Sequence, residues 1–195
     1  YIHKIKGIVM GEVRRKFKFL DVKPFSPNLG AEVYGVDLSS PLTESQFNEI
    51  RAAFLDYQVL FFKGQSEIAP GQHIEFGKRF GKLHVHPAAP TMIGQPEIFE
   101  IHATKDSKIA NGEFWHSDVS CDEEPPLGTM LQIHIVPKCG GDTMFSNMYL
   151  AYEALSAPIK QIINGLTALH SSEHIYKGRY ADRGKDDTEI TCPEA

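Results

Sequence analysis

The sequence predicts a mainly β protein with helical additions, of the α+β class, built on a curved antiparallel sheet or barrel. Three observations predict this class. Apolar segments of strand length recur along most of the chain. Helical periodicity is confined to a few stretches, most of them early. The segments do not follow the regular strand–helix alternation of a parallel sheet.

The early elements have clear local signals. Residues 17–25 and 31–38 alternate apolar and polar side chains, as half-buried strands do, and a Pro/Asn/Gly turn joins them. Thr43 and Gln46 have the spacing of a capping box, which predicts a helix over residues 42–56. Its expected apolar face is Phe47, Ile50, Phe54 and Leu55. A strand and a helix are predicted next, at residues 58–64 and 70–82.

Strands predominate in the prediction for the rest of the chain. Four segments have strand length and apolar content: residues 97–103, 114–120, 129–137 and 141–147. Residues 148–166 show helical periodicity and are predicted to form one or two helices with a break near residues 156–158. A further strand is predicted over residues 167–176, followed by a polar loop.

Composition excludes several classes of protein. A length of 195 residues, with 42% apolar and 23% charged residues, suits one globular domain over residues 1–195 or a large piece of a bigger one. The net charge of −5 argues against a nucleic-acid partner. The basic run over residues 14–18 is interpreted as a solvated strand edge, with a docking site as the alternative.

Cysteine usage and hydropathy indicate the compartment. Cys121, Cys139 and Cys192 are odd in number and form no CxxC pair, so neither a disulfide framework nor a zinc ribbon is expected. No apolar run approaches the roughly 18 residues of a membrane span, and no leader with a long apolar region is seen. We expect a soluble, cytoplasmic protein with no membrane partner.

His116 and Asp118 stand one residue apart in the segment NGEFWHSDVS, over residues 111–120. In a strand, such residues point to the same face. Imidazole and carboxylate are the ligands of non-haem Fe(II) sites. A hydrogen-bonded structural pair and a zinc-dependent hydrolase site are the alternatives, and the chain lacks the HExxH motif of many zinc enzymes. A second such pair, His73 and Glu75, lies in a predicted helix, where the two side chains diverge.

Several segments in order resemble one family. They are FWHSDVS (114–120), PPLGTMLQIHIVPKCGGDTMFSNMYLAYEALS (125–156), GAEVYGVDLSSPL (30–42), QVLFFKGQ (58–65) and FGKLHVHP (80–87). The chain resembles the taurine dioxygenase/TfdA family of Fe(II)- and 2-oxoglutarate-dependent dioxygenases over about residues 19–180.

The resemblance implies a fold and a reaction. The family fold is a double-stranded β-helix, or jelly roll, with surrounding helices. The reaction uses Fe(II), O₂ and 2-oxoglutarate to hydroxylate a small anionic organic substrate, and it releases succinate and CO₂. In the taurine branch the product breaks down to release sulfite. Homo-oligomers are common in the family, so a homo-oligomer is a further expectation.

The resemblance also assigns site residues. His116 and Asp118 match the first two iron ligands, and Thr143 matches a residue that hydrogen-bonds a 2-oxoglutarate carboxylate. His86 matches a contact to the substrate sulfonate, and Val119 matches an apolar residue of the same pocket. Without the resemblance, the GGDT segment around Thr143 is interpreted as a turn and His86 as an ordinary histidine at a strand end.

Apolar residues near these positions have two interpretations. Trp115, Val119 and Phe145 are candidates for walls that exclude water from the iron, with core packing as the alternative for Trp115 and Phe145. Cys121 lies close to the ligands in sequence and is interpreted as a packing residue, with oxidation as the alternative.

Two positions depart from the taurine pattern. Ala89 stands where the taurine enzymes carry a tyrosine, and Gly112 stands where they carry an asparagine. Both changes remove polar groups near the place of the anion. Another alkylsulfonate, a sulfate ester or a carboxylate such as an aryloxyalkanoate is therefore a candidate substrate.

The third iron ligand of the family has no match. It is a distal histidine, followed by an arginine for 2-oxoglutarate; His134, His170 and His174 do not match the first, and Arg179 and Arg183 do not match the second. We expect the chain to be an N-terminal portion of a longer enzyme, with an incomplete jelly roll. The alternative is an inactive truncated relative that acts as a small-anion binding module.

Overall fold

The computed structural model describes residues 15–177, apart from residues 88, 90, 105, 106, 108–111 and 113. The chain divides into two compact units. The first comprises Tyr1–Ile68 and Ile133–Leu166, and the second comprises Ala69–Gln132 and Thr167–Ala195. The expectation of one domain over residues 1–195 stays a prediction. In the described ranges, no helix has the length and apolar character needed to cross a membrane.

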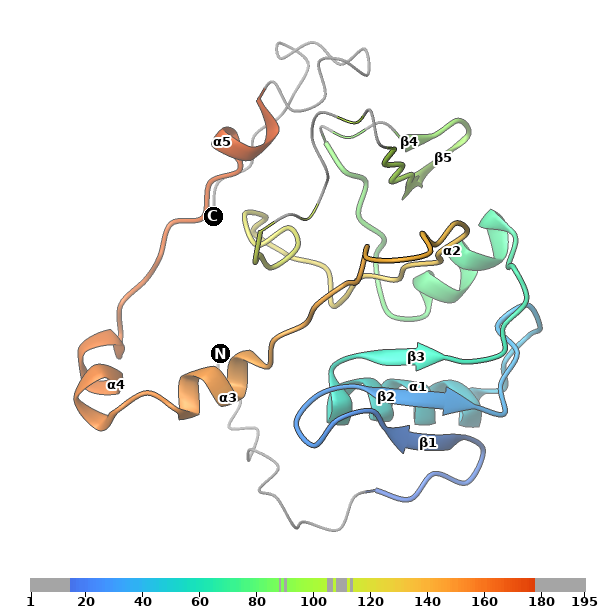
Figure 1. Cartoon of the computed structure of the whole chain (residues 1–195), viewed down its shortest axis with the longest axis horizontal. Coiled ribbons are helices and arrows are strands. Elements are labelled where there is room, and N and C mark those ends of the chain that lie inside the picture. Colours follow the sequence, from blue (N-terminus) through green and yellow to red (C-terminus); the bar gives the residue numbers. More distant parts are fainter. Residues whose placement is uncertain are drawn as a thin grey trace. The chain divides into compact units, whose positions relative to one another are not determined.

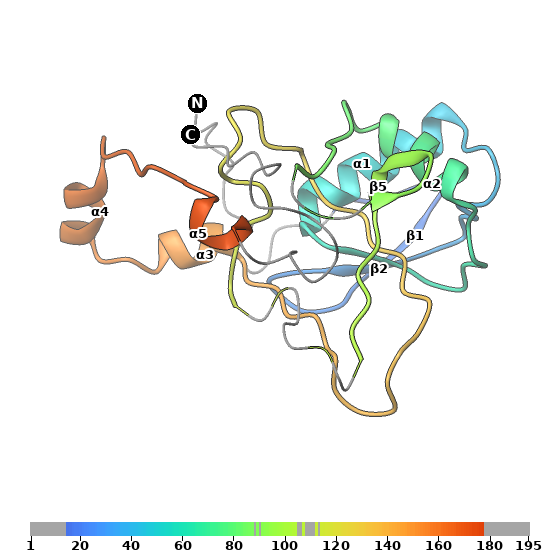
Figure 2. The same cartoon turned by 90° about the horizontal axis from the view of Figure 1, so that it is seen from above.

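A small mixed sheet and one helix form the core of the first unit (Figures 1 and 2). Strand β1 (Asp21–Pro24) pairs antiparallel with β2 (Ala31–Tyr34), and β2 pairs parallel with β3 (Leu60–Phe62). Parallel neighbours need a crossover connection, which here is helix α1 (Glu44–Tyr57). The predicted strands and helix of this region are confirmed.

The ends of α1 are fixed by its own sequence. The predicted capping box is confirmed: Gln46 N–H donates to Thr43 Oγ1 over 3.2 Å, and Thr43 N–H donates to Gln46 Oε1 over 3.0 Å. At the other end, Gln58 adopts a left-handed φ of 66°. The buried face of α1 is Phe47, Ile50, Ala53 and Tyr57. The predicted face is therefore confirmed at Phe47 and Ile50 and wrong at Leu55, which is 52% exposed. The packing of α1 leaves Ala31, Val33, Ile50 and Ala53 with no exposed surface.

The second unit contains helix α2 (Pro70–Lys78), the hairpin β4 (Thr91–Met92)–β5 (Gln95–Phe99) and helix α5 (Glu173–Tyr176). Proline suits the first turn of α2, where its missing N–H would have no helical partner. Phe76, buried, packs edge-on against Phe80 with ring centroids 5.4 Å apart. The strand predicted over residues 167–176 is wrong where α5 forms.

The later part of the chain differs most from its prediction. Helices α3 (Met148–Glu153) and α4 (Ala157–Ile163) are separated at Ser156, so the predicted break is confirmed. The strands predicted over residues 114–120, 129–137 and 141–147 are wrong, because these segments form neither strand nor helix. An apolar segment becomes a strand only when a neighbour takes its backbone hydrogen bonds. The combination of sheets and helices is thus confirmed, and the jelly roll stays a prediction.

Candidate metal and anion site

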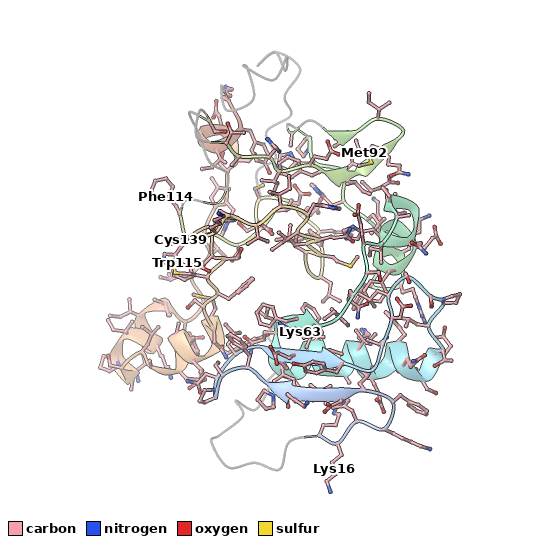
Figure 3. The ribbon with its side chains drawn as sticks, turned by 45° about the vertical axis from the view of Figure 1, so that its right-hand side comes forward. Lys16, Lys63, Met92, Phe114, Trp115 and Cys139 are labelled. Atoms are coloured by element: carbon pink, nitrogen blue, oxygen red, sulfur yellow. The ribbon has the colours of Figure 1, made fainter. Side chains whose placement is uncertain are left out.

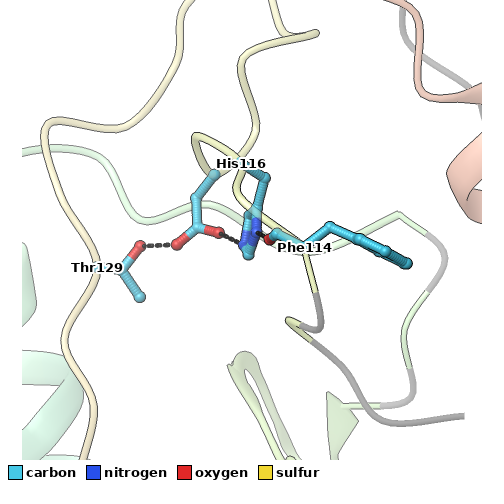
Figure 4. A network of polar contacts seen from close by, with 4 residues as sticks. Phe114, His116 and Thr129 are labelled. Atoms are coloured by element: carbon cyan, nitrogen blue, oxygen red, sulfur yellow. Dashed lines mark hydrogen bonds and ion pairs between the residues drawn. The ribbon is translucent and has the colours of Figure 1, made fainter. Parts of the chain in front are cut away.

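A backbone carbonyl fixes the orientation of the His116 imidazole. Its Nδ1 lies 2.7 Å from the carbonyl oxygen of Phe114 (Figure 4). A carbonyl can only accept, so Nδ1 must carry the proton of this hydrogen bond. The lone pair of the neutral ring is then on Nε2. This is the usual arrangement of a histidine that binds a metal.

Asp118 presents one carboxylate oxygen to that lone pair. Its Oδ1 lies 3.2 Å from His116 Nε2, while its Oδ2 accepts a hydrogen bond of 2.7 Å from Thr129 (Figure 4). Two adjacent ligands of an octahedral ion, each about 2.1 Å from it, would stand about 3.0 Å apart. The separation therefore fits a cation that both atoms bind. The alternative is a structural pair, in which a proton lies between the two atoms.

The local backbone around the pair is a turn rather than the predicted strand. Residues 118–121 form a turn, and Asp122 N–H, just after it, donates to the carbonyl of Val119 over 3.1 Å. Val119 has a φ of 52°, which is strained for a β-branched residue. Strained backbone of this kind concentrates at functional sites. The two side chains thus meet through a turn that the apolar pattern did not predict.

His86 lies in the same unit and is a neutral hydrogen-bond donor. Ala89 N–H donates to its Nδ1 over 2.9 Å, so the proton of the neutral ring is on Nε2. Burial and the neighbouring His84 lower the pKa of His86 to about 4, although the charges of Asp118 and Asp122 act in the opposite direction. At neutral pH, Nε2–H can therefore donate to an anion without a positive charge on the ring.

For the other predicted site residues, the structure gives exposure or burial. Thr143 belongs to the first unit and lies exposed in a segment without helix or strand. Trp115 is 67% exposed and Phe145 48% exposed, so neither packs in a core of the described chain; Trp115 and its neighbour Phe114 are labelled in Figure 3. Cys121 is buried, in agreement with a packing role.

Two of the histidines that do not match the distal ligand, His134 and His170, have other partners. His134 lies 3.3 Å from Glu67, and His170 Nδ1 lies 3.0 Å from Ser120 Oγ. The side chain of His174 and all of residues 178–195, with Arg179 and Arg183, lie outside the described residues. Within the described part of the chain, no group of three or more His, Cys, Asp or Glu side chains is arranged to hold a metal ion.

Sequence reasoning missed two polar contacts of this unit. Thr129 stands eleven residues from Asp118, and no motif spacing links them. His84 Nε2 pairs with Asp122 at 3.0 Å beside His86. The ring of Tyr176 also packs on that of His86, with centroids 4.8 Å apart. The resemblance of the segment HVHP made His86 a candidate site residue, but it did not predict these contacts.

The two positions that depart from the taurine pattern are both near the candidate site. Ala89 is 2% exposed and supplies the backbone donor to His86. Gly112 has a φ of +84°, and a Cβ there would lie 3.9 Å from Cε1 of His116. A larger side chain at position 112 would therefore contact the imidazole.

Comparisons with known proteins agree with the resemblance. The profile of the family described as taurine catabolism dioxygenase TauD, TfdA family matches residues 21–194. An alkylsulfatase of Acinetobacter baylyi is 36% identical over 82% of this chain and 49% of its own length. An alpha-ketoglutarate-dependent sulfate ester dioxygenase of Pseudomonas putida is 33% identical over 80% of this chain and 51% of its own.

A solved structure extends the likeness to the fold. The crystal structure of a taurine dioxygenase from Burkholderia xenovorans matches with a TM-score of 0.63 and 35% identity, over 78% of this chain and 54% of that one. The chain spans about half the length of the curated relatives it matches. The motifs, the profile and the structural likeness agree, and the chain belongs to the TauD/TfdA family of dioxygenases.

Proposed function

We propose that this protein is an Fe(II)- and 2-oxoglutarate-dependent dioxygenase that hydroxylates a small organic anion. The observation that carries the proposal is the 3.2 Å separation of His116 Nε2 and Asp118 Oδ1, with Nδ1 held by a carbonyl. These two atoms would hold Fe(II). When bound, iron and 2-oxoglutarate would supply the oxidation of a substrate carbon by O₂, with release of succinate and CO₂.

Thr143 is proposed to orient the cosubstrate. A hydroxyl can donate to one carboxylate of 2-oxoglutarate, and such a charge-assisted hydrogen bond is stronger than a neutral one. The support is its place in the GGDT segment, which resembles a family motif and lies within the residues that the family profile matches. Its exposure in the described chain leaves the hydroxyl accessible to a ligand.

His86 is proposed to recognise the anionic group of the substrate. Its Nδ1 accepts from Ala89 N–H, so Nε2 is the donor of the neutral ring, and the ring contacts those of Phe99 and Tyr176, with centroids 5.4 and 4.8 Å away. Packing on both rings limits rotation of the imidazole. Val119, half-buried next to Asp118, is proposed to contact the apolar part of the substrate.

A sulfate ester is the substrate class that we favour. The matched relatives from Acinetobacter baylyi and Pseudomonas putida are named for alkylsulfate and sulfate ester chemistry. Ala89 and Gly112 also leave out the polar side chains of the taurine pattern. Hydroxylation of the carbon that bears the ester oxygen would give an unstable product that separates into an aldehyde and sulfate.

The test uses the product of the complete coding sequence with Fe(II), 2-oxoglutarate and O₂. Three substrates are compared: an alkyl sulfate, taurine and an aryloxyalkanoate. We expect succinate and sulfate in equal amounts from the alkyl sulfate, and no turnover by Asp118→Ala. If taurine or the aryloxyalkanoate alone is turned over, the proposed sulfate ester is the wrong substrate class, and the proposed hydroxylation reaction still stands. Tight Fe(II) binding without succinate from any of the three would contradict the dioxygenase assignment for these substrates.

A further inference from the structure

The hydroxyl of Thr129 makes a short contact to one metal-facing side chain. Thr129 Oγ1 donates to Asp118 Oδ2 over 2.7 Å. Both residues belong to the second unit, eleven positions apart in sequence. A hydroxyl that donates to a carboxylate makes a charge-assisted hydrogen bond, which is stronger than one between two neutral groups.

This contact separates the roles of the two carboxylate oxygens. Oδ2 is occupied by Thr129, and Oδ1 faces His116 Nε2 at 3.2 Å (Figure 4). The terminal torsion of an aspartate is broad and two-fold, so an unsupported carboxylate can exchange its oxygens or turn both toward an ion. A donor on Oδ2 leaves Oδ1 as the oxygen that is directed at the shared point.

The arrangement at Asp118 parallels that at His116. There, the Phe114 carbonyl accepts from the outer nitrogen and leaves Nε2 directed at the same point. Each side chain of the pair is therefore held by one partner on the atom that does not face the other side chain. Partners of this outer kind typically change metal affinity by about 10–100-fold when they are removed.

We propose that Thr129 is a positioning residue of the metal site, which holds Asp118 through Oδ2 so that Oδ1 alone faces the metal. The proposal rests on the proposed function, since it takes the His116–Asp118 pair to be the metal site. The side chain of Asp118 is 50% exposed, and water competes with Thr129 for Oδ2. We therefore expect an effect near the lower end of the range, about tenfold in affinity.

The test compares Mn(II) affinity, followed by electron paramagnetic resonance, in the product of the complete coding sequence. Thr129→Val removes the hydroxyl at nearly constant shape, and Thr129→Ala removes it by truncation. We expect both to bind Mn(II) about tenfold more weakly, with an unchanged metal-free unfolding temperature. Thr129→Ser keeps the donor and should bind like the parent. Thr104→Val is the matched control, because Thr104 is exposed and both its backbone N–H and its hydroxyl lie against Ser107 Oγ, at 2.9 and 3.5 Å.

The outcomes separate the two proposals. Parent-like affinity in Thr129→Val and Thr129→Ala, while His116→Ala weakens binding, overturns the role of Thr129 and leaves the metal site standing. An equal loss in Thr129→Ser also overturns it, since the hydroxyl would then not be the cause. Absence of Mn(II) binding in the parent overturns both proposals. If Thr129→Val unfolds, the comparison of Thr129→Ala with Thr129→Ser decides the question.

Discussion

The sheet β1–β3 with helix α1 and the segment over residues 114–147 both contain many apolar residues, but only the first forms regular structure. Ala31, Val33 and Ile50 in the first region are fully buried. In the second, Ile133 is 62% exposed and Ile135 80% exposed. The strands of the first region pair with one another, whereas the described residues of the second region pair with no strand. An apolar pattern therefore predicts a strand only together with a partner.

The largest expected effect tests this difference in burial. Ile50→Ala should lower the free energy of unfolding by about 2–5 kcal/mol, because it removes a fully buried side chain and leaves a cavity. Ile135→Ala should change it by less than about 0.5 kcal/mol. Urea denaturation of this chain measures both. Equal losses for the two variants would show that the comparison is wrong and that Ile135 is covered.

Metal binding should depend on the second region and not on the helical His73–Glu75 pair. His116→Ala should weaken metal binding at least about 100-fold, more than the loss of an outer partner would. His73 lies in α2, where residues two apart diverge, so His73→Ala should leave the affinity unchanged. Calorimetric titration with Mn(II) measures both variants. Stoichiometric metal in His116→Ala, at parental affinity, would remove this residue from the ligand set.

A smaller effect concerns the capping box of the first region. Thr43→Ala removes the acceptor for Gln46 N–H and should cost about 1 kcal/mol of unfolding free energy. Thr43→Ser keeps the oxygen and should cost much less. Thermal unfolding of the two variants measures the difference. Similar melting temperatures for Ala and Ser at this position would mean that the cap does not stabilise α1.

A further expected effect is a pH dependence in the second unit. The pKa of His86 is lowered from 6.5 to about 4, so below pH 6.5 the unfolded chain binds the proton more readily than the folded chain. This contribution to stability is complete above about pH 6.5 and is lost as the pH falls toward 4. Asp118 and Asp122 oppose the shift, and His84 adds to it. His86→Gln should flatten the fall in unfolding temperature between these values, and an unchanged pH profile would contradict the assignment.

Local signals allowed the first region to be predicted from sequence. The capping box of Thr43 and Gln46 and the break at Ser156 depend on residues a few positions apart. The positive φ of Gln58 and Val119 was not predicted, because neither residue type favours it. Strand formation in residues 114–147 depends on non-local partners, which a single-sequence pattern does not identify.

The candidate site was predicted in part, and for a partly wrong reason. The His116–Asp118 pair does converge, but through a turn rather than by two-residue alternation along a strand. The family motifs selected this pair over His73 and Glu75. Thr129 and the His84–Asp122 pair were not found, since their contacts join residues whose spacing matches no chemical motif.

The placement of β1, α1 and β3 within residues 21–62 has a consequence for synthesis on the ribosome. Domains are made from the N-terminus at about 5–20 residues per second, and contacts between nearby residues form faster than long-range strand pairs. The core around Ile50 is therefore expected to close while later residues are still being added. The exposed apolar side chains over residues 131–169 then emerge when the sheet β1–β3 and helix α1 are already folded, which reduces the opportunity for mispairing in the nascent chain.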